Sequence, residues 1–397
     1  MFFILFLLLL FSFFFSKKIN GVYISPLTVY TTFFTFPSSI NLVSYNVEIS
    51  LQDWMYFLLI CVWISFFLGY ITAIFLIGRN YAIISNKNFY RFNNLLNKKF
   101  ILKLISFSII SSTATLLCLY FVYNDIGFEF YSLGRQYELS FGKYTIVNYL
   151  YYINLAVLIT CSLVVCFDFN FRYRSLCFIL GFSAFIQCVL NGQKSLILIA
   201  ILFILYSFYM IKNKINIFFL FFFILLVPII FLIVGLLRNP DNSEIASFGY
   251  INSTIESYIT YNYKNLENII LLDYSDNSGI PFIGYYFKII NFFDGNFQSL
   301  ILIDDTVPPY LENKDFNVIT YLGPIYKSFF GIPGTFLITY LISLFCSYTF
   351  FLFFKKPTIF LYSLNVILLT TLSLTFSAFE FYRLQFWFIA ILLLILF

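Results

Sequence analysis

The sequence predicts an all-α, polytopic integral membrane protein with about ten transmembrane helices and one large non-cytoplasmic loop that contains short helices. Two observations predict this fold class. Of the 397 residues, 61% are hydrophobic and 10% are charged, whereas a soluble domain carries about 25% charged residues. The chain also contains ten apolar segments, most of them near the roughly 20 residues that cross a bilayer. We therefore expect one transmembrane domain over residues 1–397.

The ten predicted membrane segments follow one another along the chain, with a long interruption after the seventh. The first segment lacks a basic start and a small-residue cleavage site, so we interpret it as an anchor helix rather than a signal peptide. The segments are Phe2–Phe15, Trp54–Ile77, Ile101–Val122, Ile146–Phe167, Leu176–Leu190, Leu196–Ile211, Ile217–Leu237, Gly334–Phe354, Thr358–Phe379 and Leu384–Phe397.

The distribution of Lys and Arg among the connecting segments predicts the orientation, because cytoplasmic loops carry an excess of both. With both termini in the cytoplasm, the inner face receives 12 of the 23 basic residues and one of the 18 acids, Asp168. These basic residues are Arg79, Lys87, Arg91, Lys98, Lys99, Lys103, Arg172, Arg174, Lys212, Lys214, Lys355 and Lys356. We expect a protein of the bacterial inner membrane with cytoplasmic N- and C-termini.

This orientation defines four outer segments: Lys17–Asp53, Tyr123–Thr145, Asn191–Ser195 and the large loop over residues 238–333. The first is apolar enough to lie in the membrane interface. The large loop contains two helix-like stretches, Ser253–Leu272, which mixes polar and aromatic residues, and the amphipathic Ile280–Phe293. An amphipathic stretch of this kind is typical of a helix on the membrane surface.

Composition excludes several kinds of chemistry. The chain has no His, which removes His-based acid–base catalysis, His metal ligands and His-activated nucleophiles. Its seven Cys lie inside apolar runs without a close pair, as is typical of buried thiols. No phosphate-binding Gly-rich motif or metal-binding acid pair is present, so we expect no cofactor, no metal and no nucleic-acid partner.

The outer face carries four cationic residues at about one membrane depth: Arg135, Lys194, Arg238 and Arg383. Guanidinium groups contact phosphate oxygens through two hydrogen bonds at once, so this set suits an anionic headgroup such as a lipid-linked diphosphate. Basic residues at helix ends are also common interface anchors, and that alternative stays open for each of the four.

Acidic residues on the same face are candidates for a general base that deprotonates a sugar hydroxyl. Spacing does not choose among them, and each is also explained as a solvated loop acid. They are Glu138, Asp241, Glu244, Asp304, Asp305 and Glu380.

One segment resembles a known family. Residues 317–334 read NVITYLGPIYKSFFGIPG, which resembles the N-x-x-T-x-x-x-P-x-Y-x-x-x-G-x-x-G segment of bacterial O-antigen and oligosaccharide repeat-unit polymerases of the Wzy type. The turn of residues 192–195 and the exit of a long helix at Arg238 resemble two further features of that family. Two departures stand out: Ser195 replaces the usual Gly, and the acid common before Phe-Gly is absent near Phe329, which puts an acidic role there in doubt.

The resemblance implies a periplasmic glycosyltransferase that uses undecaprenyl-diphosphate-linked oligosaccharides, without a nucleotide or other cofactor. Membrane lipid and a chain-length regulator protein are the further partners it implies. Catalysis is assigned to Arg238 and Arg135, which would stabilise the departing diphosphate, and to Glu138 and Asp241 as acids. Substrate binding is assigned to Lys194, Gln193, Arg383, Glu380, Asn317, Thr320, Tyr321 and Tyr326.

Three alternatives remain. A lipid-linked oligosaccharide flippase or other transporter would need a cationic cavity at mid-membrane, and no predicted segment has Lys or Arg at its centre. An O-antigen ligase shares the helix count and the large loop, but that family typically relies on a loop His. A non-enzymatic membrane scaffold is the third alternative.

Overall fold

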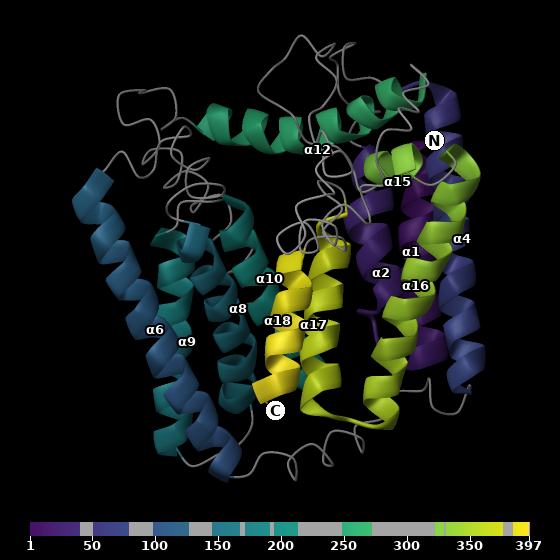
Figure 1. The fold of residues 1–397 in the computed structure, drawn as a ribbon. Coiled ribbons are helices and arrows are strands. Elements are labelled where there is room, and N and C mark those ends of the chain that lie inside the picture. The colour runs from purple at the N-terminus through teal and green to yellow at the C-terminus, as the bar shows by residue number, and fades with distance from the viewer. Residues whose placement is uncertain are drawn as a thin grey trace, which may run out of the picture. The chain divides into compact units, whose positions relative to one another are not determined.

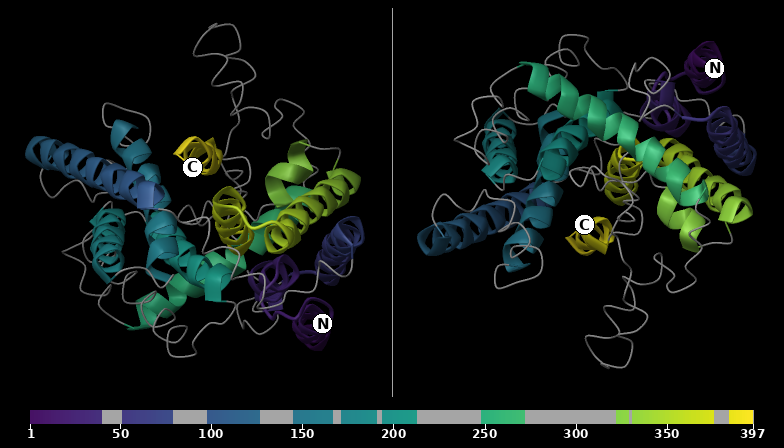
Figure 2. Two further views of the ribbon diagram at one scale, coloured as in Figure 1. Left: turned by 90° about the horizontal axis from the view of Figure 1, so that it is seen from below. Right: turned by 90° about the horizontal axis from the view of Figure 1, so that it is seen from above.

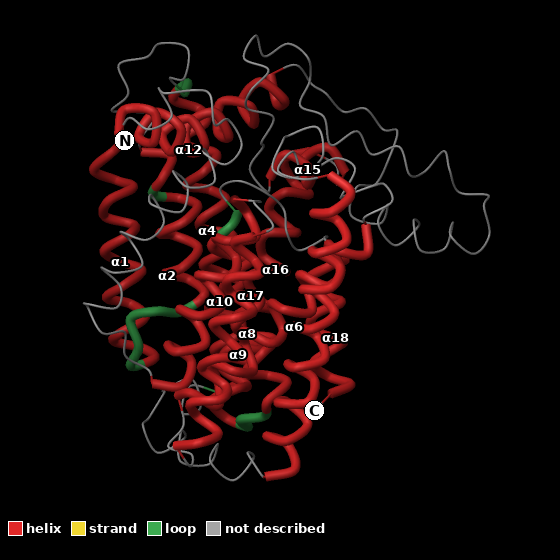
Figure 3. The backbone as a smooth tube through the Cα atoms, turned by 90° about the vertical axis from the view of Figure 1, so that its left-hand side faces the viewer, coloured by secondary structure: helices red, strands yellow, loops and turns green. Residues whose placement is uncertain are grey.

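The structure is a computed structural model that describes residues 1–39, 51–78, 98–126, 145–166, 171–190, 194–212, 248–271, 322–328, 331–375 and 384–396. Every secondary-structure element in these ranges is helical (Figure 3). The α-helices are α1 Phe2–Asn20, α2 Pro26–Tyr30, α4 Asp53–Ile77, α6 Lys98–Ile126, α8 Thr145–Cys166, α9 Phe171–Leu190, α10 Lys194–Lys212, α12 Phe248–Leu271, α15 Leu322–Ser328, α16 Gly331–Lys355, α17 Ile359–Ser373 and α18 Leu384–Leu396. A π-helical turn, η1 Thr31–Thr35, and a 3-10 turn, η2 Pro37–Ser39, continue α2.

The described helices confirm the all-helical class. Nine of the ten predicted membrane segments coincide with helices, and the remaining one, Ile217–Leu237, lies outside the described residues. Four helices, α1, α4, α6 and α16, are long and apolar enough to cross a membrane. Parts of α8 and α10, together with α17, form shorter apolar helices. The apolar helices therefore support a membrane-embedded protein, while the count of ten spans remains a prediction.

The chain divides into two compact units, each described separately. Unit 1 comprises residues 1–85, 254–356 and 371–384, and unit 2 comprises residues 86–253, 357–370 and 385–397. Helix α12 begins in unit 2 and continues from Thr254 in unit 1. The single transmembrane domain over residues 1–397 remains a prediction from the sequence.

Unit 1 is built around the close pair α4 and α16, which lie side by side in both views of Figure 2. Hydroxyl groups connect the two helices: Ser65 donates to the Phe336 carbonyl at 2.6 Å, and Tyr340 donates to Thr72 at 3.2 Å. Small residues at an interface let two membrane helices approach closely. Here Gly69 lies against the backbone of α16 and leaves no space for a side chain.

The first 39 residues form a helical hairpin in unit 1. After α1, residues 26–39 run back antiparallel to it, because Phe2 contacts Phe36, Ser12 bonds Thr31 at 2.9 Å, and Ser16 bonds Ser25 at 2.6 Å. The buried hydroxyl of Thr31 thus finds a partner on α1, as does that of Ser25 just before the returning segment. The returning segment covers about 20 Å at helical rise, which is shorter than the hydrocarbon core.

This hairpin corrects the predicted outer segment Lys17–Asp53. Helix α1 runs parallel to α4, since Phe11 packs on Trp63 and Phe15 packs on Tyr70. Residue 1 therefore lies at the end of unit 1 where α4 begins, and Lys17 and Lys18 lie at the opposite end. A 20-residue hydropathy window does not detect residues 26–39, because this segment is too short and too rich in Thr and Ser.

We call the two ends of unit 1 the α12 end and the lysine end. At the α12 end, the unit 1 part of α12 lies across the ends of the other helices of the unit rather than beside them (Figure 1). Tyr263 of α12 donates a hydrogen bond to the Phe34 carbonyl. The lysine end carries Lys17 and Lys18 of α1, Lys355 at the end of α16, and the following Lys356. The start of α1 and α12 thus share one end, whereas the sequence pattern placed them on opposite faces.

Unit 2 contains a buried polar network between α6, α8 and α9. Asn154 of α8 accepts a hydrogen bond from Ser111 at 2.8 Å and donates to Thr115 at 3.1 Å and to Gln187 at 2.7 Å. Gln187 in turn donates to Ser183 at 3.3 Å. All polar atoms of the Asn154 amide therefore have partners. Interhelical hydrogen bonds of this kind help to hold membrane helices together, because apolar side chains contact lipid about as favourably as they contact another helix.

Candidate functional site

Most of the predicted site residues lie outside the described residues, so their predicted roles remain predictions. These residues are Arg135, Glu138, Gln193, Arg238, Asp241, Asn317, Thr320, Tyr321, Glu380 and Arg383. Lys194 is the first residue of α10 in unit 2, and Tyr326 lies half-buried in α15 in unit 1.

Helix α15 and the start of α16 carry the described part of the segment that resembles the polymerases. Leu322 and Ile325 are buried, so one side of this short helix packs into unit 1. The chain then turns into α16 at Gly331, whose φ of 66° lies in the left-handed region that favours glycine. A side chain at this position would also meet the ring of Tyr326 at 3.6 Å. The glycine at the start of the Gly-x-x-Gly pattern therefore has a structural reason, which is the turn between α15 and α16.

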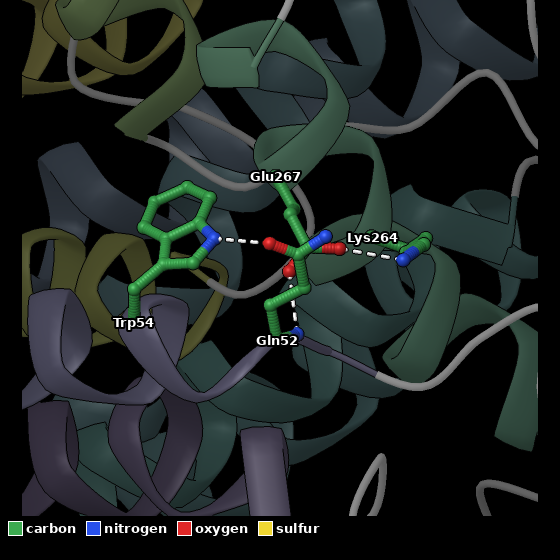
Figure 4. Close-up of polar contacts among 4 residues, drawn as sticks. All are labelled: Gln52, Trp54, Lys264 and Glu267. Carbon is green, nitrogen blue, oxygen red and sulfur yellow. Dashed lines mark hydrogen bonds and ion pairs between the residues drawn. The ribbon is translucent and has the colours of Figure 1, made fainter.

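A buried ion pair lies at the α12 end of unit 1 (Figure 4). Glu267 of α12 is 0% exposed, and one of its oxygens accepts a hydrogen bond from the backbone N–H of Gln52 at 2.6 Å. Its other oxygen lies 2.5 Å from the Lys264 ammonium, whose side chain keeps 21% exposure. A buried charge is costly unless it is paired and hydrogen-bonded, and both oxygens of this carboxylate have such partners.

Local sequence explains why Glu267 and Lys264 meet. They are three positions apart on a helix, a spacing that places side chains on neighbouring positions of one face. The apolar residues Tyr263, Leu266 and Ile269 are fully buried and fix that face of α12 toward unit 1. The helix therefore brings its carboxylate to the start of α4, which lies 215 positions earlier in the chain.

The start of α4 supplies the other half of the candidate site. Gln52 is the N-cap residue, but its side chain does not cap the helix; its Oε1 instead accepts a hydrogen bond from Trp54 Nε1 at 2.6 Å. One turn beyond Gln52, the side chain of Tyr56 is 1% exposed, and its hydroxyl has no hydrogen-bond partner among the described residues. Asp53 is exposed in the first turn.

This arrangement combines a helix N-terminus, an ammonium group and a carboxylate at one end of a bundle of apolar helices. Backbone N–H groups at a helix start and a lysine are donors that hold anionic groups. Within the described ranges, no three of the residue types Cys, Asp and Glu converge as a metal site would require. The site is therefore suited to contact an anion, with Glu267 as the anion that occupies it.

Sequence reasoning missed Glu267, Lys264, Gln52 and Tyr56. The stretch Ser253–Leu272 was correctly predicted as a helix, and α12 covers Phe248–Leu271. The i, i+3 spacing of Lys264 and Glu267 on that helix was the available signal. The contact with Gln52 could not be found, because it depends on the packing of α12 across α4.

No protein-family model, curated protein or solved structure matches this chain.

Proposed function

We propose that this chain is a membrane glycosyltransferase that polymerises undecaprenyl-diphosphate-linked oligosaccharide repeat units at the periplasmic face of the inner membrane. Three features support the proposal: the apolar helices, the resemblance of residues 317–334, and the amphipathic α12 inside the large loop. The observation that carries it is the shared location of α15 and the buried Glu267–Lys264 pair at the α12 end of unit 1. A segment that resembles the polymerases and an anion-binding arrangement thus lie at one end of the same unit.

The proposed reaction needs no nucleotide. The acceptor hydroxyl oxygen forms a bond to the anomeric carbon of the donor glycan, and the bond from that carbon to the diphosphate oxygen breaks. The electron pair leaves with the lipid diphosphate, and the hydroxyl proton passes to a carboxylate, for which Glu138 and Asp241 are the candidates. Arg238 and Arg135 stabilise the negative charge that develops on the diphosphate.

The orientation follows from the lysine end of unit 1. Lys17, Lys18, Lys355 and Lys356 gather there, whereas the described part of the α12 end carries Lys264 together with Asp53 and Glu267. The positive-inside tendency therefore supports an orientation with the lysine end in the cytoplasm and the α12 end outside. In this proposed orientation the start of α1 faces the periplasm, in contrast to the cytoplasmic N-terminus expected from the sequence.

Deletion of the gene tests the proposal. We expect lipopolysaccharide or the corresponding glycan to carry a single repeat unit, while a strain without repeat units at the outer surface would instead indicate a flippase. Complementation with Arg238→Ala should leave the single-unit product and the protein level unchanged. Arg172→Ala, on the predicted cytoplasmic face, is the matched control and should restore long chains. Long chains in the Arg238→Ala strain would contradict the assignment of Arg238. A deletion strain that displays no repeat unit at its surface would contradict the polymerase itself.

A further inference from the structure

The start of α4 is an anion-binding position that a side chain of the same protein already occupies. The first N–H groups of an α-helix have no partner within the helix, and they carry a partial positive charge. In the 25-residue helix α4, the N-cap side chain leaves this position open, and the Gln52 N–H instead binds the Glu267 carboxylate at 2.6 Å. A negative group is thus held where helix starts in other proteins hold phosphate.

The donors around this position outnumber the oxygens of a carboxylate. The two oxygens of Glu267 accept hydrogen bonds from the Gln52 N–H and the Lys264 ammonium. Tyr56 follows one turn later on the same face of α4, and its hydroxyl is buried and has no hydrogen-bond partner within the described ranges. A phosphate group carries at least three oxygens for donors of this kind, so a phosphate would use a group that the carboxylate leaves unused.

The position is also reachable from outside unit 1. Gln52 is exposed, Trp54 is half-buried, and Lys264 keeps 21% of its side-chain exposure. Helix α12 has a second attachment through Tyr263 and the Phe34 carbonyl, so Glu267 can turn away without release of the helix. Apart from Glu267, the exposed carboxylate of Asp53 is the charge in the described part of this helix start that opposes an added anion.

We propose that Gln52, Tyr56 and Lys264 form a receptor for the phosphate group of a lipid, which Glu267 occupies in the resting protein and which the ligand takes over by displacing this carboxylate. The lipid-linked diphosphate of the proposed function is the expected occupant, and in this respect the inference rests on that function. The receptor itself depends only on the contacts at the start of α4.

The experiment uses the full chain in lipid nanodiscs and measures binding of inorganic pyrophosphate through the fluorescence of Trp54. The other two tryptophans, Trp63 and Trp387, are replaced by Phe. Glu267→Gln removes the competing charge at nearly constant shape, and we expect pyrophosphate to bind about tenfold more tightly, the effect of roughly one charge-assisted hydrogen bond. Adding Lys264→Met to this variant should reverse the gain.

Asp53→Asn is the matched control, because it removes one negative charge from the same helix start without vacating the receptor. We expect a change of at most about threefold, as for an exposed charge in water. Equal gains in pyrophosphate affinity in Asp53→Asn and Glu267→Gln would refute the proposal that the ligand displaces Glu267. A gain in affinity that persists after Lys264→Met would refute it too. Ligand-induced thermal shifts of the chain with its native tryptophans provide the same comparison should the tryptophan replacements unfold the protein.

Two further arms identify the source of the phosphate. Farnesyl diphosphate, a short lipid-linked diphosphate, should bind Glu267→Gln more tightly than pyrophosphate does, and nanodiscs with phosphatidylglycerol should not compete. Competition by phosphatidylglycerol without a response to farnesyl diphosphate would overturn the lipid-linked diphosphate as occupant. These binding measurements need no glycan assay, so the receptor proposal can hold even if the genetic test refutes the polymerase. If no anion binds, the receptor proposal fails, and the genetic test alone decides the polymerase proposal.

Discussion

Substitution of Gly69 by Ala tests the close approach of α4 and α16. A Cβ atom at this position would lie 2.4 Å from the Tyr340 carbonyl oxygen, 2.8 Å from Ser343 Cβ and 3.0 Å from the Leu344 nitrogen. The first distance is roughly 1 Å too short for a non-bonded contact. Two of the three neighbours are backbone atoms of α16, so a rotamer change cannot relieve the clash and the helices must separate.

The cost follows from overpacking and from the interhelical hydrogen bonds beside Gly69. Overpacking costs about 1–3 kcal/mol, and each interhelical bond in a membrane contributes about 0.6 kcal/mol. The bonds at risk are Ser65 to the Phe336 carbonyl, Ser343 to the Phe66 carbonyl, and Tyr340 to Thr72. We therefore expect Gly69→Ala to lower the free energy of unfolding by about 2–4 kcal/mol.

Reversible unfolding in mixed micelles with increasing SDS measures this change. Gly181→Ala is the matched control, because its added Cβ would meet the Cys161 Cβ at 3.2 Å, a milder contact that a shift of a few tenths of an ångström relieves. We expect the control to lose less than about 1 kcal/mol. Equal stability of Gly69→Ala and Gly181→Ala would refute the argument that backbone contact makes this glycine irreplaceable.

Three further outcomes are expected. Asn154→Leu should destabilise the protein by about 1–3 kcal/mol in the same unfolding assay, because it removes three interhelical bonds, and Gln187→Leu should cost less; the reverse order would contradict the network. In intact cells, a membrane-impermeant maleimide should label Asp53→Cys but label Lys18→Cys only after permeabilisation, with the parent chain as background; labelling of both without permeabilisation would restore Lys17–Asp53 as one outer segment. Tyr263→Phe should increase proteolysis near α12, since it removes the bond to Phe34; unchanged cleavage would show that the bond does not hold the helix.

The sequence was sufficient for the long apolar helices and insufficient for the features that depend on tertiary partners. The segment Trp54–Ile77 was predicted within one residue of α4, since continuous apolarity is a local property. Residues 26–39 were assigned to an interfacial segment because they are apolar, and their packing as a hairpin arm depends on the bonds of Thr31 to Ser12 and Trp63, which the sequence does not show.

The candidate site shows the same limit. Lys264 and Glu267 are recognisable as neighbours on a predicted helix. Their role in an anion-binding arrangement, however, depends on the hydrogen bond from the Gln52 N–H, a backbone group that no motif search considers. The resemblance of residues 317–334 directed attention to arginines and acids of the loops. Only the packing of α12 on α4 reveals a second arrangement for an anion.

The hairpin formed by α1 and residues 26–39 has a consequence for biogenesis. The returning segment contains six Ser and Thr in fourteen residues, and its hydroxyls would be costly to leave unpaired in lipid. Thr31, at the middle of the segment, finds partners on both α1 and α4, and Ser25, just before it, bonds Ser16 of α1. The two arms should therefore enter the bilayer together. In the proposed orientation, Lys17 and Lys18 at the turn stay on the cytoplasmic side, where the ribosome works, while the start of α1 crosses to the other side. The turn would then fix the polarity of the protein before any later helix is made.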